Sequence, residues 1–268
     1  MTASDVFDGG SRVAIVTGAA RRWGLGYAAA CALGRRGYDL VVVDNREDWG
    51  SESALRIAEE TGRKAMFVNT DVSQRSQVSM MVERVLSEFG RIDALVNDAA
   101  IMSTASTEDF TDELFSKVIG VNLLGPMLCT QAVIPAMKER HYGRIVNLAS
   151  TAPYLPPPIS TGAVSLYNAS KGGLIAWTKA AATELAEYGI VVNVVAVGGI
   201  STAMGQEEAP SAETDEYQFN VMHRGMLPWG RVLKVEETAE ILAFIADAPN
   251  HALLGATIHA NGGRVMPL

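Results

Sequence analysis

Short apolar runs rich in β-branched residues alternate with longer segments of helical spacing along almost the whole chain. The runs predict strands, and the segments between them predict helices. Several of these runs are apolar at consecutive positions, which is typical of strands covered on both faces in a parallel sheet. The pattern therefore predicts an α/β fold, a doubly wound parallel sheet with helices on both faces. The candidate strands are Val13–Thr17, Asp39–Val43, Lys64–Asn69, Ala94–Asn97, Arg144–Leu148, Val191–Val197 and Thr257–Ala260, and the candidate helices are Leu25–Arg36, Ser53–Thr61, Gln74–Phe89, Asp112–Arg140, Tyr167–Tyr188 and Val235–Ala246.

The sequence shows no internal repeat and no linker between domains, so we expect residues 1–268 to form one domain. The proline run Pro156–Pro158 and the polar stretch Gly205–Glu216 interrupt the alternation. Both are typical of loops within a domain rather than of boundaries between domains.

Composition and charge argue against nucleic acid and membranes as partners. The net charge is −8 and lysines and arginines do not cluster, which argues against nucleic acid because phosphates require a basic face. The first residues, MTASDVFDGG, have neither the basic start nor the apolar core of a signal peptide. The apolar run around Ile190–Val197 is too short to span a bilayer. We therefore expect a soluble, cytoplasmic protein without a membrane partner.

The cysteines and histidines do not predict a metal site. Cys31 and Cys129 fall within candidate helices and have no CxxC partner, so we expect them to be small buried residues. The four histidines are scattered without ligand spacing. No protein-built metal centre is expected.

The first strand leads into a glycine-rich turn, RVAIVTGAARRWGLGYAAA, from Arg12 to Ala30. Backbone N–H groups at such a strand-to-helix turn, together with the helix dipole, favour the pyrophosphate of a dinucleotide. Gly18, Gly24 and Gly26 would let the backbone turn and approach the phosphate. A glycine triplet alone is a weak signal, but its position after the first candidate strand strengthens it. Five residues separate Gly18 from Gly24, more than the common dinucleotide loop contains.

The second candidate strand is followed by Asp44, about 26 residues after the first glycine. A carboxylate at that position accepts hydrogen bonds from the adenosine ribose and repels a 2′-phosphate, which favours NAD(H). Arg21, Arg22 and Arg46 are a competing signal, because any of them could pair with a 2′-phosphate. NADP therefore stays possible.

Tyr167 and Lys171 are four residues apart at the start of a candidate helix, so they share one helical face. An ammonium beside a tyrosine stabilises the phenolate and lowers the tyrosine pKa toward the working range. Ser150 follows a strand, where doubly wound sheets bind ligands. Asn122 lies on an apolar helix and needs hydrogen-bond partners, either as a local cap or kink or as part of a polar relay to the lysine.

TGAARRWGLG, Asp44, the NDAA stretch at residues 97–100, Asn122, Ser150, YNASK and the closing NGG occur in one order along nearly the whole chain. Together they resemble the short-chain dehydrogenase/reductase family. The resemblance implies a single Rossmann-type domain with a seven-stranded parallel sheet, assembled as a homotetramer or homodimer. It also implies hydride transfer between a nicotinamide cofactor and the carbonyl or alcohol carbon of a small molecule.

The resemblance implies a role for each matching residue. Tyr167 would be the general acid/base, and Lys171 would bind the nicotinamide ribose while lowering the tyrosine pKa. Ser150 would hydrogen-bond the substrate oxygen, and Asn122 would hold a water of the proton relay. Asp71 would contact the adenine, Asn97 would support the central sheet beside the cofactor, and Thr202 would bond the nicotinamide carboxamide. The residues expected to bind the cofactor are Gly18, Arg22, Trp23, Gly24, Leu25, Gly26, Asp44, Asp71, Val72, Asn97, Ala99, Tyr167, Lys171, Gly198, Ile200 and Thr202.

The chain departs from the family pattern in several places. The phosphate loop has five residues between its first two glycines instead of three, which we interpret as a lengthened lip over the pyrophosphate. The family motif NNAG appears as NDAA, with Asp98 and Ala100 substituted. The loop after Ser150 is also long, so Tyr154 and Leu155 could line the substrate cleft. Thr151 is an alternative to the serine.

Residues 203–229 are expected to form a substrate lid. Their apolar side chains at helical spacing either pack internally or face the cleft, and in the second case the pocket suits an apolar or aromatic alcohol or ketone. We predict an NAD(H)-dependent alcohol dehydrogenase or ketone reductase. The alternatives are an NADPH-dependent 3-oxoacyl-type reductase, which Asp44 disfavours, and a nicotinamide-binding protein without turnover, which Tyr167 and Lys171 disfavour.

Overall fold

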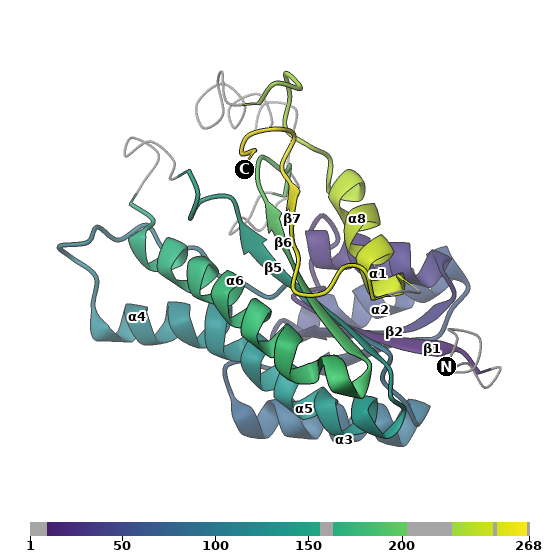
Figure 1. Ribbon diagram of the computed structural model, residues 1–268. Coiled ribbons are helices and arrows are strands. Elements are labelled where there is room, and N and C mark those ends of the chain that lie inside the picture. The colour runs from purple at the N-terminus through teal and green to yellow at the C-terminus, as the bar shows by residue number, and fades with distance from the viewer. Residues whose placement is uncertain (1–9, 156–162, 203–226, 249–250, 267–268) are drawn as a thin grey trace.

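The computed structural model describes residues 10–155, 163–202, 227–248 and 251–266. Its strands form one parallel sheet of seven, in the spatial order β3-β2-β1-β4-β5-β6-β7 (Figure 1). The predicted α/β fold is confirmed, and each candidate strand is observed within two residues of its expected bounds. The strands are β1 (Arg12–Thr17), β2 (Tyr38–Asp44), β3 (Ala65–Asn69), β4 (Ala94–Asn97), β5 (Gly143–Ser150), β6 (Ile190–Val197) and β7 (Thr257–Ala260).

Helices cover both faces of this sheet because the central strands are apolar at successive positions. In β1, Ala14 and Val16 face the core beneath α1, α2 and α8, whereas Val13 and Ile15 face the core beneath α3, α5 and α6. The period-two alternation of side chains thus supplies two cores from one strand. The helices are α1 (Leu25–Arg35), α2 (Glu47–Thr61), α3 (Arg75–Phe89), α4 (Asp112–Ile119), α5 (Gly125–Glu139), α6 (Ser165–Leu185) and α8 (Val235–Asp247), with a 3-10 turn at Ala186–Tyr188.

Two helices differ from their sequence-based bounds. The segment predicted as one helix, Asp112–Arg140, is two α-helices joined by a π-helical turn, Gly120–Leu124, that carries Asn122. The helix α2 begins at Glu47 rather than at Ser53. Its first turn contains two acidic residues and a glycine, so the sequence pattern does not show it, but Gly50 packs directly against the ring of Phe67.

The continuous helical segment Asp112–Glu139 is long and apolar enough, by length and composition, to cross a membrane. Half of its most apolar window is buried within the fold, and core helices of soluble proteins pass the same test. Charged and polar residues interrupt this segment, so it contains no long uninterrupted apolar run.

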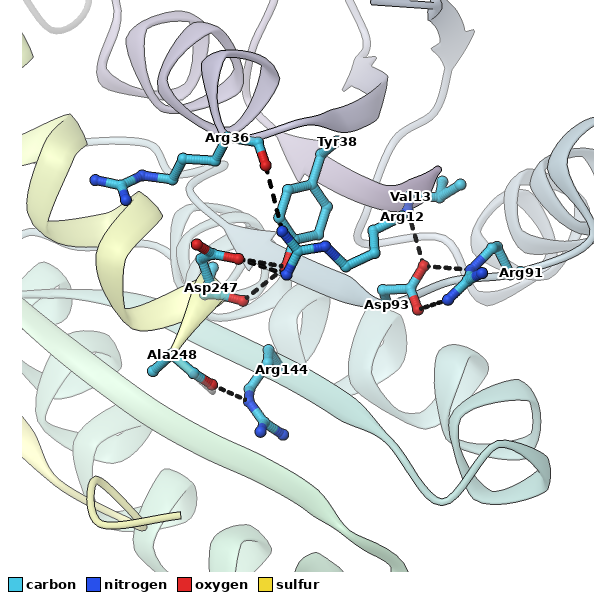
Figure 2. A network of polar contacts seen from close by, with 10 residues as sticks. Arg12, Val13, Arg36, Tyr38, Arg91, Asp93, Arg144, Asp247 and Ala248 are labelled. Carbon is cyan, nitrogen blue, oxygen red and sulfur yellow. Dashed lines mark hydrogen bonds and ion pairs between the residues drawn. The ribbon is translucent and has the colours of Figure 1, made fainter. Parts of the chain in front are cut away.

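The amino ends of the strands carry a polar network (Figure 2). Arg12, the first residue of β1, pairs with Asp247 at the end of α8 and lies over the ring of Tyr38. Asp93, just before β4, accepts hydrogen bonds from Arg91 and from the backbone of β1. These contacts connect the amino ends of the strands. Ser150 is the last residue of β5 and therefore lies at the opposite end of the sheet.

The carboxyl ends of the strands meet at the other edge. The strand order reverses between β1 and β4, which is the position where doubly wound sheets bind ligands. Parallel pairing places Thr17 beside Asn97, and Asn97 beside Asn147. The loops that follow β1, β4 and β5 therefore lie next to one another at the carboxyl edge of the sheet.

Candidate active site

Three of the predicted catalytic residues lie together. Ser150 ends β5, and Tyr167 and Lys171 lie one turn apart near the start of α6. The hydroxyls of Tyr167 and Ser150 are hydrogen-bonded, and Lys171 Nζ donates to the backbone oxygen of Leu148 at 2.7 Å. Because Tyr167 is 7% and Lys171 2% exposed, the tyrosine and the lysine are held by packing as well as by hydrogen bonds.

Burial sets the protonation state of this site. Desolvation raises the pKa of Tyr167 to about 12, and the hydrogen bond with Ser150 opposes part of that rise. Desolvation also lowers the pKa of Lys171 to about 8, because a buried ammonium loses its hydration. The lysine is thus close to losing its proton in the physiological range. The Tyr167 hydroxyl is neutral and able to donate. The lowering of its pKa that was expected from Lys171 is not observed, because desolvation outweighs the effects that favour the phenolate.

Asn122 lies in the π-helical turn and is fully buried. Its side chain makes paired hydrogen bonds with the backbone of Ile101, at 2.8 and 2.9 Å, and donates to Ser170 Oγ at 3.2 Å. Ser170 in turn donates to the backbone oxygen of Tyr167. Asn122 therefore braces the first turn of α6 against the loop after β4, and its expected role in holding a water stays a prediction.

The glycine-rich turn has the close backbone packing that a phosphate loop needs. Gly18 has φ +70°, and a Cβ there would lie 2.8 Å from the backbone of Ala99. A Cβ at Gly26 would lie 2.7 Å from the Gly18 oxygen. The N-cap of α1 is Gly24, which has no capping side chain, and the first turn of α1 contains no acidic residue. Amides at a helix N-terminus that no capping residue of the helix itself satisfies fit a bound pyrophosphate.

The additional loop residues pack against the start of α2. Trp23 and Trp49 form a tilted aromatic pair with centroids 5.9 Å apart. The guanidinium of Arg46 lies 3.9 Å from the Trp49 ring centroid, and that of Arg21 lies 5.3 Å from it. Arg22 is exposed. Trp49 was not among the predicted site residues, and only its place shortly after Asp44 could have pointed to it.

Asp44 is the last residue of β2, as predicted. Its two carboxylate oxygens accept hydrogen bonds from the backbone N–H groups of Ala20, at 3.1 Å, and Arg46, at 3.2 Å. Desolvation raises the pKa of Asp44, while these backbone donors act in the opposite direction. The carboxylate is thus fixed between the phosphate loop and the start of α2.

Two other residues predicted to bind the cofactor, Asn97 and Asp71, make hydrogen bonds within the protein. Asn97 donates to Asn147, which donates to Thr178 on α6, so these hydrogen bonds connect β4 and β5 to α6. Asp71 accepts hydrogen bonds from the backbone and hydroxyl of Ser73 within its own loop. The partners Asn147 and Thr178 carried no signal in the sequence.

The remaining predicted residues border the same end of the sheet. Val72 is buried against Gly125, and the backbone amide of Ala99 donates to the Thr17 hydroxyl. Leu25 is buried in the first turn of α1. Gly198, Ile200 and Thr202 follow β6, and Ile200 bridges to Leu233. Residues 203–226 of the predicted lid lie outside the described residues.

The loop after β5 distinguishes Ser150 from its alternative. The side chain of Thr151 is fully buried, its hydroxyl has no hydrogen-bond partner among the described residues, and a Cβ at Gly198 would lie 2.3 Å from it. Ser150, not Thr151, contacts Tyr167. Tyr154 is 40% exposed and packs edge-on against His259, with centroids 4.9 Å apart.

The two cysteines are buried, as the sequence led us to expect. Cys31 and Cys129 form no disulfide. Within residues 10–155, 163–202, 227–248 and 251–266, no group of three or more His, Cys, Asp and Glu side chains could hold a metal ion.

Comparison with known proteins places this geometry in a family. The family model for short chain dehydrogenases matches residues 12–213. A 3-oxoacyl-[acyl-carrier-protein] reductase of Synechocystis is 35% identical, with 96% of this chain and 98% of that protein covered. An uncharacterized oxidoreductase of Bacillus subtilis is 32% identical over 94% of this chain and 97% of its own length. A short-chain dehydrogenase/reductase crystal structure from Mycobacterium marinum superposes with a TM-score of 0.84 and 30% identity, covering 99% of this chain and 100% of that chain. The chain belongs to the short-chain dehydrogenase/reductase family of oxidoreductases.

Proposed function

We propose that this protein is an NAD(H)-dependent oxidoreductase that interconverts a secondary alcohol and the corresponding ketone. The observation that carries the proposal is the buried contact between Ser150 and Tyr167, with Lys171 one helical turn away. A hydroxyl that is itself hydrogen-bonded to a second hydroxyl at a ligand-binding sheet edge is suited to exchange a proton with an alcohol or carbonyl oxygen. The nicotinamide, when bound, supplies the hydride donor or acceptor.

The residues of this chain manage the proton. Ser150 Oγ accepts a hydrogen bond from the Ala152 backbone and contacts Tyr167, so it can orient a substrate oxygen beside the tyrosine hydroxyl. In the reducing direction Tyr167 donates its proton to that oxygen, and in the oxidising direction the phenolate accepts it. Lys171 lies one turn away on the same helical face, and in its protonated form it would favour the phenolate.

The choice of NAD over NADP rests on Asp44. Its carboxylate is held at the end of β2 by two backbone donors, where it would accept from a ribose hydroxyl and repel a 2′-phosphate. Arg46 lies over Trp49 and pairs with Asp48. The ion pair with Asp48 therefore partly neutralises Arg46, which weakens its attraction for the 2′-phosphate of NADP.

A second candidate is an NADPH-dependent reductase of the 3-oxoacyl type. Two observations favour it: relatives named as 3-oxoacyl-[acyl-carrier-protein] reductases are 32–35% identical to this chain, and Arg21 and Arg46 flank Trp49 near the cofactor loop. A turnover-free nicotinamide-binding protein is the least supported reading, because it would not need the buried pair of Tyr167 and Lys171.

We further propose that residues 1–268 act as one dinucleotide-binding and catalytic domain with a substrate lid at 203–229. The protein would act in the cytoplasm on a small alcohol or ketone and assemble as a homotetramer or homodimer.

The experiment that tests the proposal has two parts. Titration of intrinsic tryptophan fluorescence with NADH and with NADPH compares the two dissociation constants. Trp23 lies within the glycine-rich loop, so its fluorescence should change when either cofactor binds. A panel of secondary alcohols and ketones is then assayed with the preferred cofactor. Preference for NADH with turnover of simple alcohols supports the proposal. Preference for NADPH with turnover of 3-oxoacyl thioesters would instead establish the second candidate.

A further inference from the structure

Asp98 introduces a carboxylate where the family motif has an asparagine. It follows β4, and its backbone amide donates to the hydroxyl of Thr17 at the end of β1. Its side chain points beneath the glycine-rich turn. One carboxylate oxygen lies 2.8 Å from the position that a Cβ of Gly26 would occupy, and the carboxylate accepts a hydrogen bond from the Gly26 backbone.

This arrangement puts a negative charge at the N-terminus of α1 before any ligand is bound. Gly26 lies in the first turn of α1, whose N-cap has no side chain to satisfy the amides. A helix N-terminus favours an anion, because its backbone N–H groups and its dipole are positive there. The carboxylate of Asp98 already takes one of the amides there, so a pyrophosphate held by the same turn would meet a like charge.

Resting on the proposed binding of a nicotinamide dinucleotide, we propose that Asp98 couples cofactor binding to uptake of a proton: the dinucleotide binds with the Asp98 carboxyl neutral. A neutral carboxyl keeps the packing of the side chain and removes the repulsion between the carboxylate and the pyrophosphate. Asp98 is a positioning residue in this scheme, because it acts on the cofactor through the loop.

The charges around Asp98 allow this coupling near neutral pH. Lys171 on α6 favours the carboxylate, whereas desolvation and the neighbouring charge of Asp44 on β2 disfavour it. The α1 first turn contributes the Gly26 amide and no acidic side chain. Desolvation is the largest of these effects and raises the pKa of Asp98 to about 7. The dianionic pyrophosphate would raise it further.

Binding of NADH at several pH values tests the proposal. From pH 6 to pH 8 the dissociation constant of the wild-type protein should rise by about three- to tenfold, as expected when a group with a pKa near 7 must be protonated in the complex. Calorimetric titration at pH 7 in phosphate and in Tris should report uptake of about half a proton per NADH. Neither readout depends on turnover.

The variant Asp98→Asn restores the neutral amide and should bind NADH with a dissociation constant that changes less than about twofold over the same pH range. It should also take up almost no proton. Asp109→Asn, which removes the same charge from an exposed loop residue, should behave as the wild type.

Thermal unfolding separates this coupling from a purely structural role. Because the pKa of Asp98 is raised in the fold, the folded chain binds more protons than the unfolded chain between about pH 4 and pH 7, and stability is lost as the pH rises through that window. Asp98→Asn should therefore melt higher than the wild type at pH 8, and the difference should narrow toward pH 5. A lower melting temperature at every pH would show a structural helix cap and overturn the proposal.

The wild-type data alone can also refute the coupling. A dissociation constant for NADH that is unchanged from pH 6 to pH 8, with no proton uptake, overturns the inference and leaves the proposed function standing. Absence of binding of both NADH and NADPH at every pH overturns the proposed function, and the inference with it.

Discussion

Replacing Tyr167 with phenylalanine removes one buried oxygen from the proposed site and leaves the ring. The ring is 7% exposed and Lys171 Nζ lies 5.9 Å from its centroid, so packing on α6 should be retained. Loss of a positioned general acid/base costs about 10²–10⁴ in rate, or about 3–5 kcal/mol. We expect kcat to fall by that factor.

The effect on stability should be much smaller. The lost hydroxyl makes a hydrogen bond with Ser150, and one such bond contributes about 1 kcal/mol net to folding. For a chain of this size that corresponds to a fall of about 2–4 °C in melting temperature. Binding of NADH should stay within about twofold of the wild type, because the hydroxyl exchanges protons with substrate.

Steady-state turnover of the best substrate from the alcohol and ketone panel measures the rate effect, with fluorescence titration and thermal unfolding beside it. Tyr188→Phe is the matched control, because Tyr188 lies in the 3-10 turn before β6 at the opposite end of the sheet and packs against Lys138. If the Tyr167 variant folds, binds NADH and keeps more than about a tenth of the wild-type kcat, another group moves the proton and the proposed mechanism is refuted.

Three further changes test other parts of the structure. Asp44→Ala should narrow the preference for NADH over NADPH by about tenfold in fluorescence titrations, and an unchanged ratio would assign selection to the arginines near Trp49. Gly18→Ala should weaken NADH binding and lower the melting temperature, because Gly18 has φ +70° and a Cβ there would clash with the Ala99 backbone. Wild-type affinity for NADH together with a wild-type melting temperature would contradict the close packing of the loop. Asp93→Asn should cost about 3–5 kcal/mol in the free energy of unfolding, since it removes the carboxylate from the buried Arg91–Asp93 ion pair, while kcat stays unchanged; equal melting temperatures would be inconsistent with that buried pair.

The alternation of short apolar runs with longer segments of helical spacing was sufficient to predict a parallel sheet covered by helices. The two faces of β1, for example, are both apolar in sequence, and each packs in a different core. Strand bounds follow from such local patterns because a buried strand tolerates few polar side chains. The residues Ser150, Tyr167 and Lys171 were also predicted, since their positions at a strand end and one helical turn apart are local features.

Tertiary structure decided the contacts that join distant segments. The sequence could not show that Asn122 would lie in a π-helical turn and pair with Ile101, because neither the turn nor the partner has a local pattern. It showed that Asp98 replaces an asparagine but not that the carboxylate reaches Gly26, more than 70 residues away. Hydrogen bonds and desolvation depend on which groups meet in three dimensions, so the protonation of the site had to be derived from the fold.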